Sequence, residues 1–328
     1  MNQKKLIQIL KTSEIIPRIE SSIERSQISK SEKLKRILSN QKKINYNEPR
    51  GLFSQVKNFF IRKHFPKKRF HYFINGERQE VVFEFNDSSL DLPHVYYTSE
   101  NTLEKYLSRA INFPPHRERL LPLVDAIRKK TFNLEKQAKI AVSLVQNIPY
   151  KKKFIDLRWR FPFEVIKENK GICGEKTGLL VFLLKELGFG TAVFDYDKRD
   201  YYSRNIFERY ILPFRCDFLH ANAGVKCKKE YQYEGSGYAV IETTAPKIIT
   251  DYSWNDRRKV KPWAKRLPKN FKLIPISDGK ELDVSEEYFD AQEFIRVNTI
   301  AESGSNLSRK DYEIYCKLAD KYGLNRRD

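Results

Sequence analysis

The stretch GICGEKTGLLVFLLKELGFG, residues 171–190, decides the fold. It predicts a helix over residues 173–187 with apolar residues almost all round it, and Gly188 is suited to end that helix. A helix that is apolar on every side must be buried, so we expect it at the centre of a domain. Cys173 stands at its N-terminus, where partial positive charge and free N–H groups favour a thiolate. Cys173 is therefore a candidate nucleophile.

Two glycines, Gly171 and Gly174, flank this cysteine. Glycines allow a sharp turn into the helix and a close approach of a substrate carbonyl, and the first N–H groups of the helix are candidates for an oxyanion hole. An inert buried cysteine is the alternative interpretation, since free cysteines are commonly buried.

The pattern around this helix predicts an α+β fold. Before it come helices near residues 98–112 and 117–130, an amphipathic helix from residue 133 that ends before Pro149, and a loop containing RWRFPFEVIKENKG. After it, TAVFDYD, CDFLHANAGVKC and GYAVIETT predict three strands. A buried helix that carries a cysteine at its start and precedes an antiparallel sheet is an α+β arrangement.

His220 is the candidate base among the chain's 5 histidines. The other four precede the cysteine helix and are predicted to lie in the arm, the hairpin or loops, whereas His220 lies in a predicted core strand. The period of two places it on one face with Phe218 and Asn222. The alternative is a core histidine whose ring is simply hydrogen-bonded.

Glu242 is the candidate acidic partner, because a carboxylate within an apolar strand is costly to bury alone. A histidine on the neighbouring strand would satisfy it, and the carboxylate would in turn fix the imidazole tautomer. An exposed glutamate on an edge strand is the alternative.

At these residues the chain resembles the transglutaminase-like superfamily, and the resemblance covers about residues 133–246, closest to prokaryotic and archaeal members. QNIPY, then RFPFEVIKENKGICGEKTGLLVFLLKELG, then HANAGV and YAVIETTAP follow the order of that family's motifs. The resemblance implies a papain-like core with Cys173, His220 and Glu242 as its triad. It also makes Gln146 a candidate for the oxyanion hole, beside the simpler reading of a glutamine on a helix surface.

The same resemblance implies a thiol enzyme that acts on protein or peptide amide bonds through a thioester intermediate, with hydrolysis as the expected reaction and no cofactor. One departure is visible: most members carry Asp in a DPT-like motif, where this chain has Glu242-Thr243-Thr244. Glu is longer by one methylene, so its contact with His220 is expected to be reoriented.

The formal net charge of +20 is concentrated near the start: residues 1–70 hold 18 Lys and Arg against 5 Asp and Glu. We expect a basic, mainly helical arm at residues 1–65, which binds nucleic acid or an acidic protein, or is simply a solvated lysine-rich surface. A non-catalytic scaffold carrying this arm is the alternative to the enzyme. Without an apolar run long enough to span a bilayer, or a secretory signal, we expect a cytoplasmic protein.

The domain prediction places a β-hairpin at residues 66–90, with Asn75-Gly76 as its turn, the transglutaminase-like domain at 95–300 and a C-terminal helix within 301–328. Trp159 lines a substrate groove or packs in the core. A metal site is not expected, because Cys216 and Cys227 differ in strand parity and no CxxC pair is present. Cys316 is expected to pack within the C-terminal helix.

Overall fold

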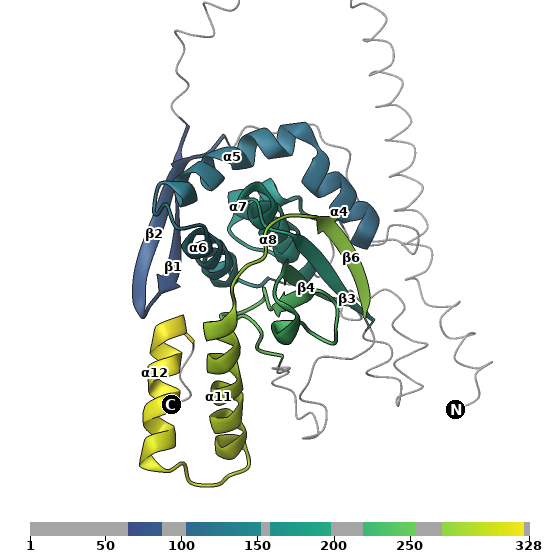
Figure 1. The fold of residues 1–328 in the computed structure, drawn as a ribbon. Coiled ribbons are helices and arrows are strands. Elements are labelled where there is room, and N and C mark those ends of the chain that lie inside the picture. Colours follow the sequence, from purple (N-terminus) through teal and green to yellow (C-terminus); the bar gives the residue numbers. More distant parts are fainter. Residues whose placement is uncertain (1–64, 87–102, 152–157, 198–218, 253–270, 325–328) are drawn as a thin grey trace, which may run out of the picture. The chain divides into compact units, whose positions relative to one another are not determined.

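The computed structural model describes residues 65–86, 103–151, 158–197, 219–252 and 271–324 (Figure 1). Helices and antiparallel strands occupy separate stretches of this part of the chain, which places it in the α+β class, as the sequence predicted. Within the same ranges, no helix is both long and apolar enough to cross a membrane. The predicted basic arm lies outside them, apart from its last residue.

A four-stranded antiparallel sheet has the order β5-β4-β3-β6. Its strands are β3 (Thr191–Asp197), β4 (Leu219–Lys226), β5 (Tyr238–Ile241) and β6 (Lys272–Ser277). The three predicted strands are confirmed, and β6 is a fourth that the sequence analysis did not predict. Its Pro275 lies opposite Ala192, beside a register shift at one side of the sheet, which is where a strand tolerates a residue without an N–H group.

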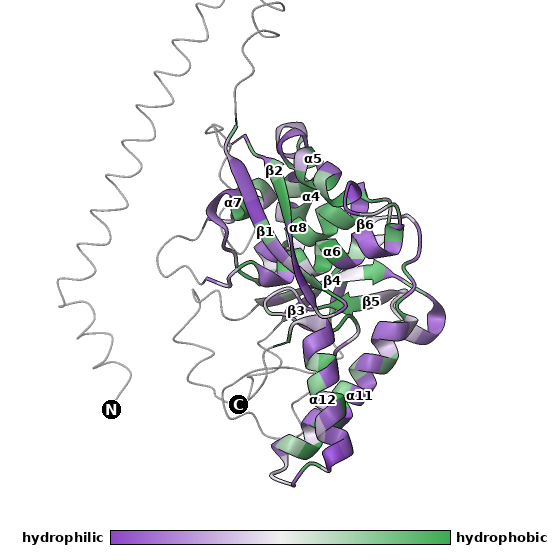
Figure 2. Ribbon diagram, turned by 90° about the vertical axis from the view of Figure 1, so that its left-hand side faces the viewer, coloured by the Kyte–Doolittle hydropathy of each residue, from purple (hydrophilic) through white to green (hydrophobic). Residues whose placement is uncertain are grey.

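Helix α8 (Cys173–Glu186) is the predicted central helix, and every residue from its start to Leu184 is buried. It packs on β4 and β3, while α4 (Leu103–Asn112), α6 (Leu134–Asn147) and α7 (Pro162–Glu168) contact it from other sides. Figure 2 shows hydrophobic residues gathered around α4, α6 and α8. The expectation of a helix at the centre of the core is therefore confirmed.

The expectation of a loop over RWRFPFEVIKENKG was wrong, because α7 lies within it. Pro162 occupies the first turn, where its missing N–H group is not needed, and the Glu164 carboxylate accepts a hydrogen bond from the N–H group of Phe161 at 2.8 Å. Asn169 ends the helix in the left-handed conformation, with φ of 48°. These start and stop signals are present in the sequence.

The predicted hairpin is formed by β1 (Lys67–Ile74) and β2 (Glu77–Glu84). Asn75 and Gly76 have φ angles of 50° and 81°, which is the geometry that the Asn-Gly signal predicts. The hairpin packs against α6 and α5 (Pro114–Arg128).

Helices α11 (Ser285–Glu302) and α12 (Arg309–Tyr322) pack side by side, and α12 also contacts β1 (Figure 1). The predicted caps of the last helix are present: the Ser308 hydroxyl accepts from the N–H group of Asp311, and Gly323 has a φ of 62°. α11 was not predicted, and the proposed domain boundary at residue 300 falls inside it.

Candidate active site

Cys173 is the first residue of α8, and 9% of it is exposed. The residue before it, Ile172, is extended, so the chain turns into the helix at the cysteine itself. The N–H groups of the first helical turn, and the positive end of the helix dipole, therefore lie at the cysteine end of α8.

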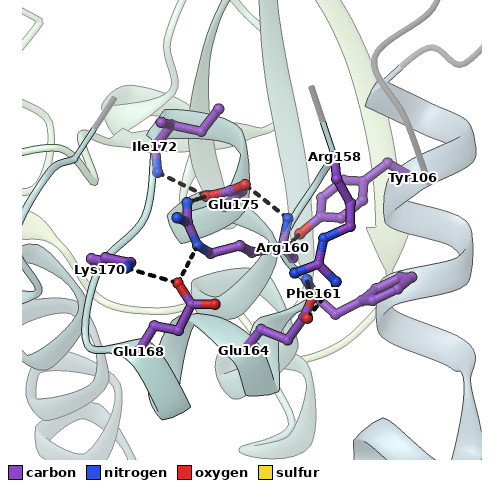
Figure 3. Close-up of polar contacts among 9 residues, drawn as sticks. All are labelled: Tyr106, Arg158, Arg160, Phe161, Glu164, Glu168, Lys170, Ile172 and Glu175. Atoms are coloured by element: carbon purple, nitrogen blue, oxygen red, sulfur yellow. Dashed lines mark hydrogen bonds and ion pairs between the residues drawn. The ribbon is translucent and has the colours of Figure 1, made fainter. Parts of the chain in front are cut away.

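A buried carboxylate fixes this helix start (Figure 3). The carboxylate of Glu175 accepts hydrogen bonds from the N–H groups of Ile172, at 3.1 Å, and Arg160, at 2.8 Å, and pairs with the Arg160 guanidinium at 3.1 Å. The guanidinium also binds Glu168 at 2.8 Å. Because charge and hydrogen bonds are both satisfied, the burial of Glu175 is tolerated, and the segment before α7 is fixed to the start of α8.

Trp159 packs on the same helix turn. It is 3% exposed and stacks on Tyr106, with ring centroids 4.5 Å apart. A Cβ added at Gly174 would lie 2.5 Å from this indole ring. Core packing is therefore the role the structure gives to Trp159, and Gly174 leaves room for the indole.

His220 lies on β4 directly opposite Tyr196 of β3. Its Nε2 is 3.0 Å from Oε2 of Glu242, and its ring also forms a hydrogen bond with the side chain of Cys173. Since Nε2 faces the carboxylate, Nδ1 is the nitrogen left for the thiol. The three predicted residues, from α8, β4 and the end of β5, are thus brought together.

The charge on this histidine is strongly favoured. Burial lowers the pKa of the imidazole, but the negative charge of Glu242 and the hydrogen bonds to Cys173 and Glu242 together outweigh it and raise the pKa to about 9. An imidazolium beside a cysteine stabilises the thiolate.

Glu242 directly follows β5, one residue outside the strand in which it was expected. Its Oε1 accepts hydrogen bonds from the N–H groups of Thr243 and Thr244, at 2.9 and 2.8 Å, and from the Thr244 hydroxyl at 2.8 Å. Burial alone would raise the pKa of this carboxyl, but His220, Lys247 and the Thr244 N–H group lower it well below its usual range. One oxygen is thus fixed by its own loop and the other faces the histidine.

Two threonines that the sequence analysis did not single out connect the three elements. The Thr177 hydroxyl donates to the carbonyl of Ala221 on β4 at 3.1 Å and lies 3.1 Å from the hydroxyl of Thr243. The Thr243 hydroxyl is also 3.5 Å from the carbonyl of Cys173. All of these groups are buried, so they fix the strands against the first turns of α8. Thr177 lies one turn after the cysteine, a spacing from which its place could have been predicted.

Gln146 does not point a free amide at the thiol. Its Nε2 donates to the carbonyl of Glu242 at 2.8 Å and to the carbonyl of Lys247 at 2.9 Å. Both amide hydrogens are used in this way, so the side chain connects α6 to the segment after β5. The expectation of an oxyanion-hole glutamine is replaced by this anchoring role. Gln146 also lines a cleft between β1, α6, α11 and α12 that takes in none of the three residues at the thiol.

Two further cysteines, Cys227 and Cys316, lie in the described part of the chain. Cys227 is 1% exposed, and burial raises the pKa of its thiol to about 12. Cys316 is half-buried on α12. Cys216 lies outside the described residues. No group of three metal-ligating side chains occurs among the residues that the structure describes.

His116 was expected in a loop but lies in the first turn of α5, 1% exposed. Its ring packs between Phe161 and Phe163, at centroid distances of 4.3 and 4.8 Å, and burial lowers its pKa to about 4. Two core histidines are therefore present among the residues that the structure describes, and contact with a cysteine and a carboxylate singles out His220.

Comparison with known proteins adds no family. No protein-family model matches this chain, and no curated protein matches it significantly.

Proposed function

We propose that this chain is a transglutaminase-like thiol enzyme that acts on protein or peptide amide bonds, with Cys173 as nucleophile, His220 as acid and base, and Glu242 as the orienting carboxylate. The observation that carries the proposal is the imidazole of His220, which contacts both the thiol and the carboxylate although the three residues come from separate elements. The order of helix and strands agrees with a papain-like core.

The first half-reaction forms a thioester. The thiolate of Cys173 attacks the carbonyl carbon of the amide, and the oxygen becomes an oxyanion beside the N–H groups that begin α8. As the C–N bond breaks, the His220 imidazolium gives its proton to the leaving amine. Glu242 keeps the ring oriented and stabilises its charged form.

The second half-reaction releases the acyl group. His220, now neutral, takes a proton from water as its oxygen attacks the thioester carbonyl, and the thiolate leaves. Hydrolysis returns a carboxylic acid, whereas an attacking amine would form a new amide. The steps need no metal or cofactor, since proton transfer and thiolate attack are supplied by the three side chains.

Alkylation of Cys173 by iodoacetamide across a range of pH tests the proposal. In the wild type we expect Cys173 to react at about pH 6 at least tenfold faster than an ordinary thiol, because an ordinary thiol is almost fully protonated there. His220→Ala should abolish this advantage, and Cys173→Ala should remove the modified peptide. Labelling of wild-type Cys173 at the rate of an ordinary thiol, unchanged in His220→Ala, would refute it.

Product analysis then distinguishes the reaction classes. With a glutamine-containing peptide, ammonia release, backbone cleavage and incorporation of a primary amine give different masses. We expect hydrolysis, and loss of every product in Cys173→Ala.

A further inference from the structure

Lys176 is a fully buried lysine on the nucleophile helix, one turn after Cys173. Its Nζ donates to the carbonyl of Ile148 at 2.6 Å and to the carbonyl of Gln146 at 3.2 Å. These carbonyls belong to the C-terminal end of α6, where helical carbonyls lack partners and the helix dipole is negative. The ammonium group therefore caps α6 from within the core.

The surroundings hold this side chain in one place. A Cβ at Gly171 would lie 3.1 Å from Cγ of Lys176, so the chain just before the cysteine crosses closely over the lysine stem. The same stretch is attached to the end of α6, because the N–H group of Gly171 donates to the carbonyl of Pro149 at 3.2 Å. The charge cannot swing out to solvent without breaking these contacts.

An ammonium group in this position acts on the site as well as on α6. Glu242 and Cys173 are the charged and titratable groups that act on it, and both favour its protonated form. Burial nevertheless lowers the pKa of Lys176 to about 7. By reciprocity, a protonated Lys176 must favour the ionised forms of Glu242 and Cys173.

Resting on the thiol site proposed above, we infer that Lys176 is a positioning residue of that site: capping α6 with its ammonium group, it fixes the first turn of α8 and supplies a second positive charge that supports the Cys173 thiolate. A capping lysine needs only its hydrogen bonds, whereas support of the thiolate needs its charge. Substitutions can separate these two roles.

The experiment measures alkylation of Cys173 by iodoacetamide from about pH 5 to pH 10 in full-length variants, with the modified peptide quantified by mass spectrometry. Lys176→Met removes charge and hydrogen bonds, Lys176→Gln keeps a donor without charge, and Lys176→Arg keeps the charge. In the Met and Gln variants we expect the apparent pKa of Cys173 to rise by about one unit, which slows alkylation at pH 6 by about tenfold, with an unchanged rate at high pH. Lys176→Arg should stay within about twofold of the wild type.

Val145→Ala is the matched control, because it loosens the buried contact of α6 with the core and leaves the charges in place. The inference is overturned if Val145→Ala shifts the pH profile of Cys173 alkylation as far as Lys176→Gln does. It is also overturned if neither Lys176→Met nor Lys176→Gln shifts that profile. Should Lys176→Met fail to fold, Lys176→Gln alone decides. The His220→Ala measurement separates the two proposals: a wild-type Cys173 that is activated by His220, together with an unshifted Lys176→Gln, removes only the role of Lys176.

Discussion

At the scale of single residues, Glu242 combines two functions in one carboxylate. Oxygen Oε1 is bound by the backbone and hydroxyl of the following threonines, and Oε2 faces His220. An aspartate, shorter by one methylene, would have to give up one of these contacts or move the loop. The added length of glutamate thus agrees with a carboxylate placed just beyond the end of β5.

Replacing Glu242 with Gln should inactivate the thiol while preserving the shape of the loop. The amide oxygen can still accept from the threonines, but its NH₂ group would face Nε2 of His220 and favour the tautomer with the proton on Nδ1. That tautomer cannot accept the thiol proton, so we expect alkylation of Cys173 at pH 6 to fall at least about tenfold.

Glu242→Asp is the control for this change, since it keeps the charge with a shorter reach, and its rate should lie between those of the wild type and Glu242→Gln. Equal rates for the wild type and Glu242→Gln would contradict the assigned role.

His220 and Lys176 should give the folded protein pH dependences of opposite sign. The pKa of His220 is raised from 6.5 to about 9, so its contribution to stability is fully present below pH 6.5 and is lost as the pH rises through 9. The pKa of Lys176 is lowered from 10.5 to about 7, so its unfavourable charge is relieved as the pH rises from 7 to 10.5.

Urea unfolding at a series of pH values checks this. The free energy of unfolding of the wild type minus that of His220→Gln should fall as the pH rises from 6.5 to 9. The same difference taken with Lys176→Met should rise from pH 7 to 10.5. Two differences that run in the same direction would show that one of the two pKa shifts has the wrong sign.

At the scale of elements, strong periodic signals were predicted well and short or interrupted ones were not. α8 is apolar almost all round and the hairpin has an Asn-Gly turn, so both could be predicted from local sequence alone. α7 was missed because its 7 residues are too few for a periodic signal, although its proline and Glu164 mark the start. β6 contains Pro275 and joins the sheet only through pairing with a strand far away in the chain.

The site residues show the same difference between local and long-range signals. Cys173 and His220 stand out by residue type and position, whereas the roles of Thr177 and Lys176 depend on which distant carbonyls lie beside them. The family resemblance made Gln146 a candidate for the oxyanion hole. Only its contacts in the structure reveal that it connects α6 to the segment after β5.

Gln146→Ala should therefore lower the free energy of unfolding, and its main effect should not be on turnover. Loss of two hydrogen bonds to buried carbonyls should lower the free energy of unfolding by about 1–3 kcal/mol, measured by urea unfolding. Gln137→Ala is a matched control on the same helix, because that side chain donates a single hydrogen bond to the carbonyl of Thr131. An oxyanion-hole glutamine would give the opposite result, a large loss of turnover with unchanged stability.

At the scale of the whole molecule, the described residues account for the thiol site, and half of the net charge of +20 lies in front of them, because residues 1–64 hold 15 Lys and Arg against 5 Asp and Glu. In Figure 2, α11 and α12 carry many hydrophilic residues. The proposed binding of an anionic partner by the basic arm rests on charge, so the dependence of that binding on salt concentration tests it.

We expect the full-length chain to bind a fluorescent single-stranded oligonucleotide with an affinity that falls linearly on a logarithmic plot against salt concentration. Replacing Lys33, Lys35 and Arg36 with Glu should weaken binding and flatten this slope in fluorescence anisotropy, while alkylation of Cys173 stays unchanged. An affinity that changes neither with salt concentration nor with these substitutions would contradict an electrostatic role of the arm. Preferential binding of polyglutamate would indicate an acidic protein as the partner instead.

The contact between Gly174 and Trp159 restricts the order in which this sequence can change. Because any Cβ at residue 174 meets the indole at 2.5 Å, a larger residue beside the nucleophile becomes acceptable only after residue 159 has become smaller. The reverse order passes through an overpacked intermediate. Descendants of this chain that carry a side chain at position 174 should therefore have lost the tryptophan first, and the two positions should vary together.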